Sequence, residues 1–86
     1  MATFPDRLKE LRKSKGLTQK SLGEIIGLSE RGIQNYELGN NKPTSDVLSN
    51  LADYFGITVD YLLGRTNYWF DPEGNIKSKV PPDITW

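Results

Sequence analysis

Residues 19–38, QKSLGEIIGLSERGIQNYEL, decide the fold of this chain of 86 residues. Apolar residues at spacings of three and four predict two short helices, one on each side of the segment Gly27-Leu28-Ser29. Because a turn of three residues is short, we expect the two helices to cross steeply, at about 90 to 120°. Gly23 lies inside the first helix, although glycine costs about 1 kcal/mol there, so the second helix is expected to approach closest at this residue.

The same pattern of helix starts and stops continues on both sides of this pair. Five glycines each follow an apolar segment with helical spacing: Gly16, Gly27, Gly39, Gly56 and Gly64. Pro5 suits a first helical turn, and four hydroxyl residues suit the N-caps of the other helices: Thr18, Ser29, Thr44 and Thr58. No Glu or Gln follows these caps three residues later, so no complete capping box is expected. Because no strand-like alternation occurs before residue 66, the sequence predicts an all-α fold of five short helices joined by tight turns.

The composition excludes several classes of protein. The chain has no Cys and no His, which removes disulfides, zinc sites built from thiolates or imidazoles, and hydrolytic triads with a histidine base. We therefore expect no enzyme, no metal and no cofactor. The first residues lack the pattern of a signal peptide, and no stretch approaches about 18 apolar residues, which favours a cytoplasmic protein with no membrane partner.

The charge of the chain is balanced in total but not along its length. Lys+Arg and Asp+Glu number 11 each, so the formal net charge is zero. Residues 1–42 hold eight basic and five acidic residues, which gives +3, and the remainder carries −3. This asymmetry indicates a basic working face on the N-terminal part of the protein.

Several short motifs, in this order, resemble the helix-turn-helix family of phage repressors and Cro proteins, also named for the xenobiotic-response-element regulators. They are Leu8-Lys9-Glu10-Leu11-Arg12, Gly16-Leu17-Thr18-Gln19, Gly27-Leu28-Ser29, the stretch IQNYELG at 33–39, and Tyr61-Leu62-Leu63-Gly64. The resemblance covers residues 5–64 and implies a repressor-like DNA-binding domain over residues 1–65, with the helix-turn-helix at 19–38. Two positions depart from the family pattern: Gly23 stands where Ala is usual, and Gly32 stands where a hydroxyl residue is common.

The resemblance also implies a function. Members of this family are sequence-specific transcriptional regulators that bind double-stranded DNA, typically bacterial or phage repressors. The expected mode is reading of the major groove by residues 29–38, and the expected partner is an operator of two half-sites bound by a homodimer.

The second helix of the pair presents polar residues on the face opposite the core. With Ile33 set at 0° and about 100° per residue, Arg31 falls at about 160°, Gln34 at about 100° and Asn35 at about 200°. Glu30 falls at about 60°, at the edge of the first turn. Arg can bond guanine twice, Gln or Asn can pair with adenine, and Glu can accept from the cytosine amino group, so we expect these four residues to read bases. Since any exposed helix face is polar, the assignment depends on the turn geometry.

Other polar residues near the pair are expected to bind DNA phosphates. Gln19 begins the first helix, where unpaired N–H groups attract an anion, and the resemblance implies that it bonds a phosphate. The expected phosphate-binding residues are Gln19, Ser29, Asn40, Asn41 and Lys42. The alternatives are that Gln19 is an ordinary solvated residue and that the two Asn residues only shape the turn.

Arg12 and Glu37 are expected to form a structural ion pair. Both project toward the apolar side of their helices, at about 40° from the core direction, where a charge needs a partner. The resemblance implies the same pair, partly buried, between the first helix and the base-reading helix. Its role would be to hold that helix in position.

The character of the sequence changes after Gly64. Asp71-Pro72-Glu73-Gly74 suits a type I turn, and residues 75–80 alternate polar and apolar, so residues 66–86 are expected to form a C-terminal extension with a β-hairpin. Because an isolated hairpin is marginally stable, the extension is expected to form a homodimer interface or to dock on its own bundle. The alternative function is a protein-interaction module, such as an antitoxin or coactivator, that holds a protein partner with this aromatic extension. No small-molecule ligand is evident from the sequence.

Overall fold

A computed structural model describes residues 3–66, 68–70, 73 and 76–77. The described residues form five helices and one short pair of strands: α1 (Phe4–Ser14), α2 (Gln19–Ile26), α3 (Glu30–Leu38), α4 (Ser45–Phe55), α5 (Val59–Leu62), β1 (Trp69–Phe70) and β2 (Ile76–Lys77). The predicted bundle of five helices is confirmed. No helix within these residues has both the length and the apolar character that crossing a membrane requires.

The helices begin and end where the local sequence signals indicate. Four hydroxyl side chains each accept the N–H group three residues later: Thr18, Ser29, Thr44 and Thr58. The five glycines that follow the helices all have positive φ angles, between 67° and 79°. The N-cap of α1 is Thr3, which the sequence patterns do not indicate.

The expectation that no complete capping box forms is wrong for α2. The Thr18 N–H donates to Ser21 Oγ at 2.9 Å, and the Ser21 N–H donates to Thr18 Oγ1 at 3.0 Å. A serine hydroxyl therefore does what the side chain of Glu or Gln usually does at this position. Its short side chain keeps the oxygen close enough to the main chain to reach the N-cap.

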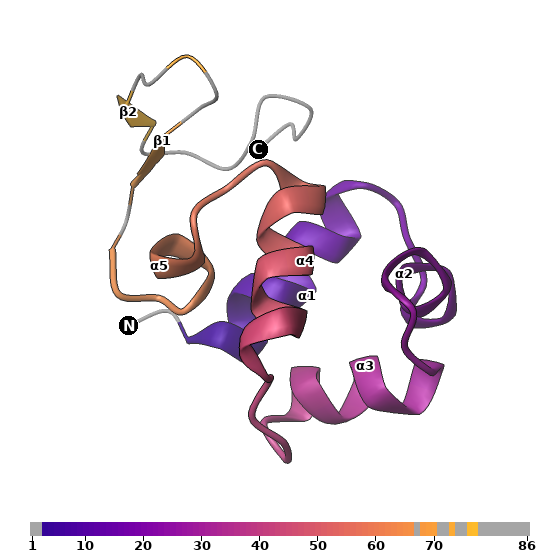
Figure 1. Ribbon diagram of the computed structural model, residues 1–86. Coiled ribbons are helices and arrows are strands. Elements are labelled where there is room, and N and C mark those ends of the chain that lie inside the picture. Colours follow the sequence, from indigo (N-terminus) through magenta and orange to yellow (C-terminus); the bar gives the residue numbers. More distant parts are fainter. Residues whose placement is uncertain (1–2, 67, 71–72, 74–75, 78–86) are drawn as a thin grey trace.

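A shared apolar core stabilises helices that are too short to be stable alone. Six side chains from all five helices are fully buried: Leu8, Leu11, Leu22, Ile33, Leu51 and Leu62. In Figure 1, α4 and α1 lie through the middle of the bundle, with α2 and α3 on one side and α5 on the other. Each fully buried leucine contributes about 1.5 to 3 kcal/mol, so the core outweighs any single cap.

A buried arginine fixes the C-terminal end of the bundle to α1. Arg7 is 6% exposed, and its Nη1 donates to the carbonyl oxygens of Tyr61 at 2.7 Å and Thr66 at 3.0 Å. Its guanidinium lies 3.9 Å from the centre of the Tyr61 ring. Burial raises the pKa of the Tyr61 phenol above its usual value, with smaller opposing effects from Arg7, which lowers it, and Glu10, which raises it. Arg7 therefore holds the chain at the point where the extension begins.

The described part of the extension is an antiparallel strand pair. Trp69 lies opposite Lys77 and Phe70 lies opposite Ile76. This pairing agrees with the hairpin expected from the sequence, although most of the expected turn at 71–74 lies outside the described residues. In Figure 1 the pair lies at the upper left and α3 along the lower edge, so the described part of the extension is away from α3.

Candidate nucleic-acid interface

The turn between α2 and α3 brings two stretches of main chain into direct contact. Gly27 has a φ of 79°, and the Leu28 N–H donates to the Gly23 carbonyl at 2.7 Å, which turns the chain immediately after α2. A Cβ atom on Gly23 would lie 2.4 Å from the Leu28 carbonyl oxygen, far closer than real Cβ contacts. Gly23 is therefore the point of close approach, as expected, but the main chain that approaches it belongs to the turn at Leu28 and Ser29 and not to α3 itself. This contact fixes the turn that leads into α3.

The four residues expected to read bases lie on α3 with their side chains accessible to different degrees. Glu30, Arg31 and Gln34 are exposed, and Asn35 is half-buried. Among the described residues Arg31 has no ion-pair partner, so its guanidinium is available to a ligand. The Asn35 Oδ1 accepts a long hydrogen bond from Asn40 Nδ2 at 3.5 Å. Since a carboxamide oxygen can accept two hydrogen bonds, this contact orients the Asn35 side chain and still leaves its oxygen able to accept from an adenine.

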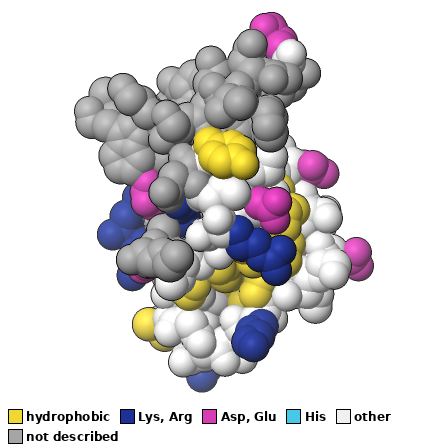
Figure 2. Space-filling view, turned by 90° about the vertical axis from the view of Figure 1, so that its left-hand side faces the viewer, with side chains coloured by type: hydrophobic (Ala, Val, Ile, Leu, Met, Phe, Trp, Pro, Cys, Tyr) yellow, Lys and Arg dark blue, Asp and Glu magenta, His cyan; other side chains and the backbone are white. Residues whose placement is uncertain are grey.

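The outer face of α3 lies at an edge of the molecule. In Figure 1, α3 runs along the lower edge with the rest of the bundle above it. Figure 2, a quarter turn away, shows Lys and Arg side chains on the lower part of the face in view, and most of the Asp and Glu side chains higher up. Residues 1–42, which include α1, α2 and α3, carry a net charge of +3, and this favours attraction of a polyanion to that part of the molecule.

A buried network joins α1, α2 and α3 behind this face. Arg12 donates from Nε to Glu37 Oε2 at 2.6 Å and from Nη2 to Glu37 Oε1 at 2.9 Å. The side chain of Glu37 is 1% exposed and that of Arg12 is 12% exposed. Arg12 also donates to the Leu17 carbonyl at 2.8 Å, and Gln19 Nε2 donates to Glu37 Oε1 at 3.3 Å. The expected ion pair is present, and its carboxylate holds the first residue of α2 as well.

The residues expected to bind phosphates lie at the N-termini of α2 and α3 and in the loop that follows α3. Gln19 is half-buried and uses one amide hydrogen on Glu37, which leaves the other for a ligand. Ser29 Oγ accepts the Gly32 N–H at 3.0 Å and keeps its own hydroxyl hydrogen to donate. The remaining three are exposed in the loop that follows α3: Asn40, Asn41 and Lys42.

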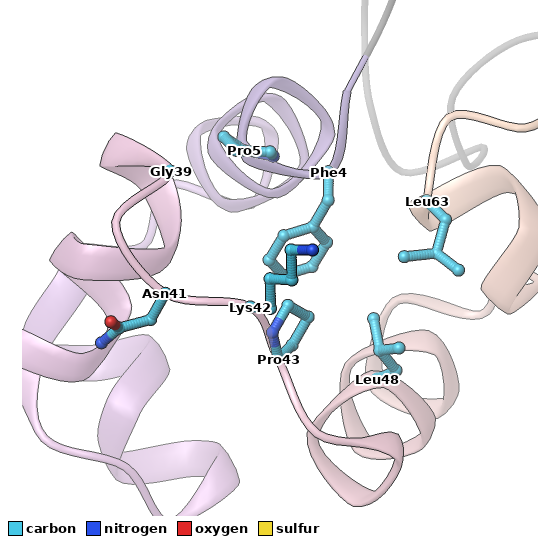
Figure 3. A pocket seen from close by; sticks show the side chains of 8 residues that line it. All are labelled: Phe4, Pro5, Gly39, Asn41, Lys42, Pro43, Leu48 and Leu63. Atoms are coloured by element: carbon cyan, nitrogen blue, oxygen red, sulfur yellow. The ribbon is translucent and has the colours of Figure 1, made fainter.

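An apolar pocket of about 360 Å³ lies behind this loop. Its lining residues come from α1, the loop, α4 and the end of α5: Phe4, Pro5, Gly39, Asn41, Lys42, Pro43, Leu48 and Leu63. In Figure 3 the side chain of Asn41 points away from the pocket, whereas Leu48 and Leu63 point toward it. The loop therefore has an inner side against the bundle and an outer side that carries Asn41.

The outer side of α3 also carries an apolar residue, Leu38, which is not among the four residues expected to read bases. Leu38, the last residue of α3, is 63% exposed and does not pack in the hydrophobic core. Its helical angle of about 140° places it in line with Arg31 on the outer face. The sequence signal for this position is an apolar residue at a helical angle that points away from the core.

Comparisons with known proteins match this bundle. A helix-turn-helix family model matches residues 8–62. The uncharacterized HTH-type transcriptional regulator YobD of Bacillus subtilis is 37% identical over 89 residues, which cover 96% of this chain and 77% of YobD. YonR, an SPbeta prophage-derived HTH-type transcriptional regulator of the same organism, is 35% identical over 68 residues, 79% of this chain and 63% of its own.

A solved structure extends the comparison to three dimensions. The P22 c2 repressor, crystallised in complex with synthetic operator 9T, superposes with a TM-score of 0.69 and 27% sequence identity. The match covers 73% of this chain and 96% of the repressor chain. The curated relatives are longer than their matched parts, since the chain covers 63% of YonR and 46% of the regulator ImmR of Bacillus subtilis.

Proposed function

The chain belongs to the helix-turn-helix family, and on this premise we propose that it is a DNA-binding transcriptional regulator that reads double-stranded operator DNA with α3. The form that we propose is a repressor of bacterial or phage type, which acts in the cytoplasm by binding and not by catalysis. The relatives are regulators by name, and the P22 c2 repressor was crystallised with an operator. The observation that carries the proposal is the exposed polar face of α3, which follows the turn fixed by the close contact at Gly23.

In this proposal α3 enters the major groove, which is wide enough to admit an α-helix. Arg31 donates two hydrogen bonds to guanine, and Gln34 pairs with adenine. Glu30 accepts from a cytosine amino group, and Asn35 pairs with adenine, because its side-chain oxygen can accept a second hydrogen bond beside the one from Asn40. The exposure of Arg31 and Gln34 supports their roles most directly, because in the described part of the chain neither side chain has a polar partner to leave first.

Contacts to the phosphates would hold α3 in register without reading sequence. Gln19 and the N-terminus of α2 offer hydrogen-bond donors on one side of α3. The Ser29 hydroxyl offers another donor at the N-terminus of α3. Asn40, Asn41 and Lys42 would bind the backbone beyond the C-terminal end of α3. Among these five residues only Lys42 contributes a positive charge.

Selection of duplexes from a randomised pool by the full chain tests the proposed function. We expect one short preferred sequence, bound more tightly than a duplex of the same composition in scrambled order. A salt titration on the selected duplex is expected to lower the logarithm of the association constant by about 0.9 for each phosphate neutralised, per tenfold change in salt. Equal affinity for the selected and scrambled duplexes would contradict a sequence-specific regulator.

We further propose that the chain reads two half-sites as a homodimer. Half-sites of helix-turn-helix dimers lie about one helical turn, or 34 Å, apart. Support comes from Tyr68, which is 44% exposed at the start of an extension that lies away from α3 in Figure 1.

Sedimentation velocity of the full chain with duplexes of one and of two half-sites tests the homodimer. Two chains are expected to bind the longer duplex cooperatively, because the contact between them adds to each DNA contact. Independent binding of the second chain, with the affinity measured for a single half-site, would contradict the homodimer.

A protein-interaction module on the same fold, such as an antitoxin or coactivator, is the second candidate function. The exposed Tyr68 favours it, because an aromatic side chain on an extension away from α3 suits contact with a protein. A chain that acts only in this way would select no duplex, and variants of Arg31 and Gln34 would leave its binding to the partner unchanged.

A further inference from the structure

We propose that Leu38 is a specificity-determining residue that contacts the 5-methyl group of a thymine, about three base pairs from the base pair read by Arg31. The inference rests on the proposed function and names a base that the polar residues of α3 do not read. It starts from the exposure of Leu38, which leaves 63% of a large apolar residue in water at the end of an otherwise polar face.

Leu38 lies on the same side of α3 as Arg31. Leu38 follows Arg31 by seven residues, and two helical turns at about 100° per residue bring it back to within about 20° of the same direction. The two side chains therefore leave α3 along one line. Gln34 and Asn35 occupy the turn between them, on either side of that line.

The length of α3 sets where on the duplex Leu38 would lie. Seven residues at a rise of about 1.5 Å span about 10.5 Å along the helix axis. Base pairs of B-form DNA follow one another at about 3.4 Å, so this length corresponds to about three base pairs when α3 lies along the groove. Arg31 and Leu38 then address two separate positions of one half-site.

The chemistry of the side chain selects the base. Leucine neither donates nor accepts a hydrogen bond, and the apolar group that the major groove offers is the C5 methyl of thymine. Leu38 is absent from the core and from the residues that pack against it, so a DNA contact would not disturb the fold. It is also absent from the lining of the pocket behind the loop, so that apolar surface does not cover it.

A deoxyuridine substitution tests the contact, because uracil lacks only the methyl group of thymine. The full chain is measured on its selected operator with thymine or uracil at the position three base pairs from the one where Arg31→Ala relaxes the preference. We expect uracil to weaken binding about fourfold, the value of one buried methyl-sized group. Leu38→Ala is expected to bind both duplexes equally, whereas Leu38→Met, which keeps an apolar side chain, retains the difference.

The outcomes separate this inference from the proposed function. Selective binding that is the same for thymine and uracil, or a uracil effect that persists in Leu38→Ala, overturns the role of Leu38 and leaves the regulator intact. Absence of selective binding to any duplex overturns the proposed function, and the role of Leu38 with it. Thermal unfolding of Leu38→Ala is expected to match that of the unchanged chain, because the side chain makes no core contact.

Discussion

Replacing Arg12 with alanine is expected to lower the free energy of unfolding by about 3 to 5 kcal/mol, the usual effect of removing one partner of a buried ion pair. The substitution removes two hydrogen bonds to Glu37 and one to the Leu17 carbonyl. Within the described residues, the Glu37 carboxylate, 1% exposed, then keeps one hydrogen bond, the long one from Gln19 at 3.3 Å. Since water reaches neither side chain freely, little screening offsets this loss.

Urea and thermal unfolding followed by circular dichroism measure this change. In a domain of this size each kcal/mol shifts the melting temperature by about 4 to 8 °C, so Arg12→Ala is expected to melt at least about 12 °C lower. Arg65→Ala is the matched control, because Arg65 pairs with Asp60 at 3.6 Å with both side chains more than half exposed, 70% and 62%. That exposed pair contributes about 1 kcal/mol at most. Equal effects of the two variants would refute the reasoning from burial.

A double variant separates stability from positioning. Arg12→Met combined with Glu37→Leu leaves no charge without a partner, so most of the lost stability is expected to return. Gln19 then has no carboxylate to hold its amide, and DNA affinity is expected to remain below that of the unchanged chain. Wild-type affinity in a fully folded double variant would show that the network does not position Gln19.

Three further predictions follow from the structure. Gly23→Ala is expected to destabilise the protein by about 1 to 3 kcal/mol, because its Cβ meets a main-chain oxygen at 2.4 Å. Gly32→Ala is expected to cost less, because its Cβ would lie 3.3 Å from the Ser29 hydroxyl, which has to shift by only a few tenths of an ångström while it keeps the hydrogen bond from the Gly32 N–H. Thermal melts compare the two variants, and an equal or larger loss in Gly32→Ala contradicts this reasoning. Burial raises the pKa of the Tyr61 phenol, so the stability that this group contributes is complete below the unfolded pKa of about 10 and is lost as pH rises through the folded pKa. Urea unfolding between about pH 8 and about pH 11 is expected to show that the free energy of unfolding falls less steeply with pH in Tyr61→Phe than in the unchanged chain. Lys42→Ala is expected to weaken binding to all duplexes alike and to reduce the salt slope by about 0.9. Arg31→Ala is expected to cost about 1 to 3 kcal/mol of binding free energy and to relax the preference at one base pair. Competition with mutated duplexes distinguishes these outcomes.

Local chemistry explains why the helix boundaries were predictable from the sequence. Thr44 and Gly56 bracket α4 because a hydroxyl N-cap and a positive φ are needs of the adjacent main chain and do not depend on the rest of the fold. The pairing of Arg12 with Glu37 was also predictable, since both lie on the apolar side of their helices and a buried charge needs a partner. The outward direction of Arg31 and Gln34 follows from the same helical period.

Contacts between a side chain and a distant main chain could not be predicted in this way. Arg7 donates to carbonyl oxygens 54 and 59 residues away, and such a bond leaves no periodic pattern in the sequence. The hydrogen bond between the side chains of Gln19 and Glu37 could not be predicted either, because Gln19 looks like an ordinary first-turn residue until α3 is placed beside it. Asn35 likewise loses part of its hydrogen-bonding capacity to Asn40, which only the fold of the loop reveals.

Because the chain has no net charge, DNA affinity is expected to depend strongly on hydrogen bonds from neutral groups such as the Gln19 amide and the Ser29 hydroxyl. Counterion release depends on positive charges that neutralise phosphates, and of the five residues proposed to bind phosphates only Lys42 has one. The amide of Gln19 and the hydroxyl of Ser29 contribute only where their hydrogen atoms point directly at an oxygen. Affinity then depends on how accurately α2 and α3 are placed. The Arg12–Glu37 pair joins α1 to α3, and the hydrogen bond from Gln19 joins α2 to the same carboxylate. Loss of that pair should therefore weaken binding even under conditions in which the protein remains folded.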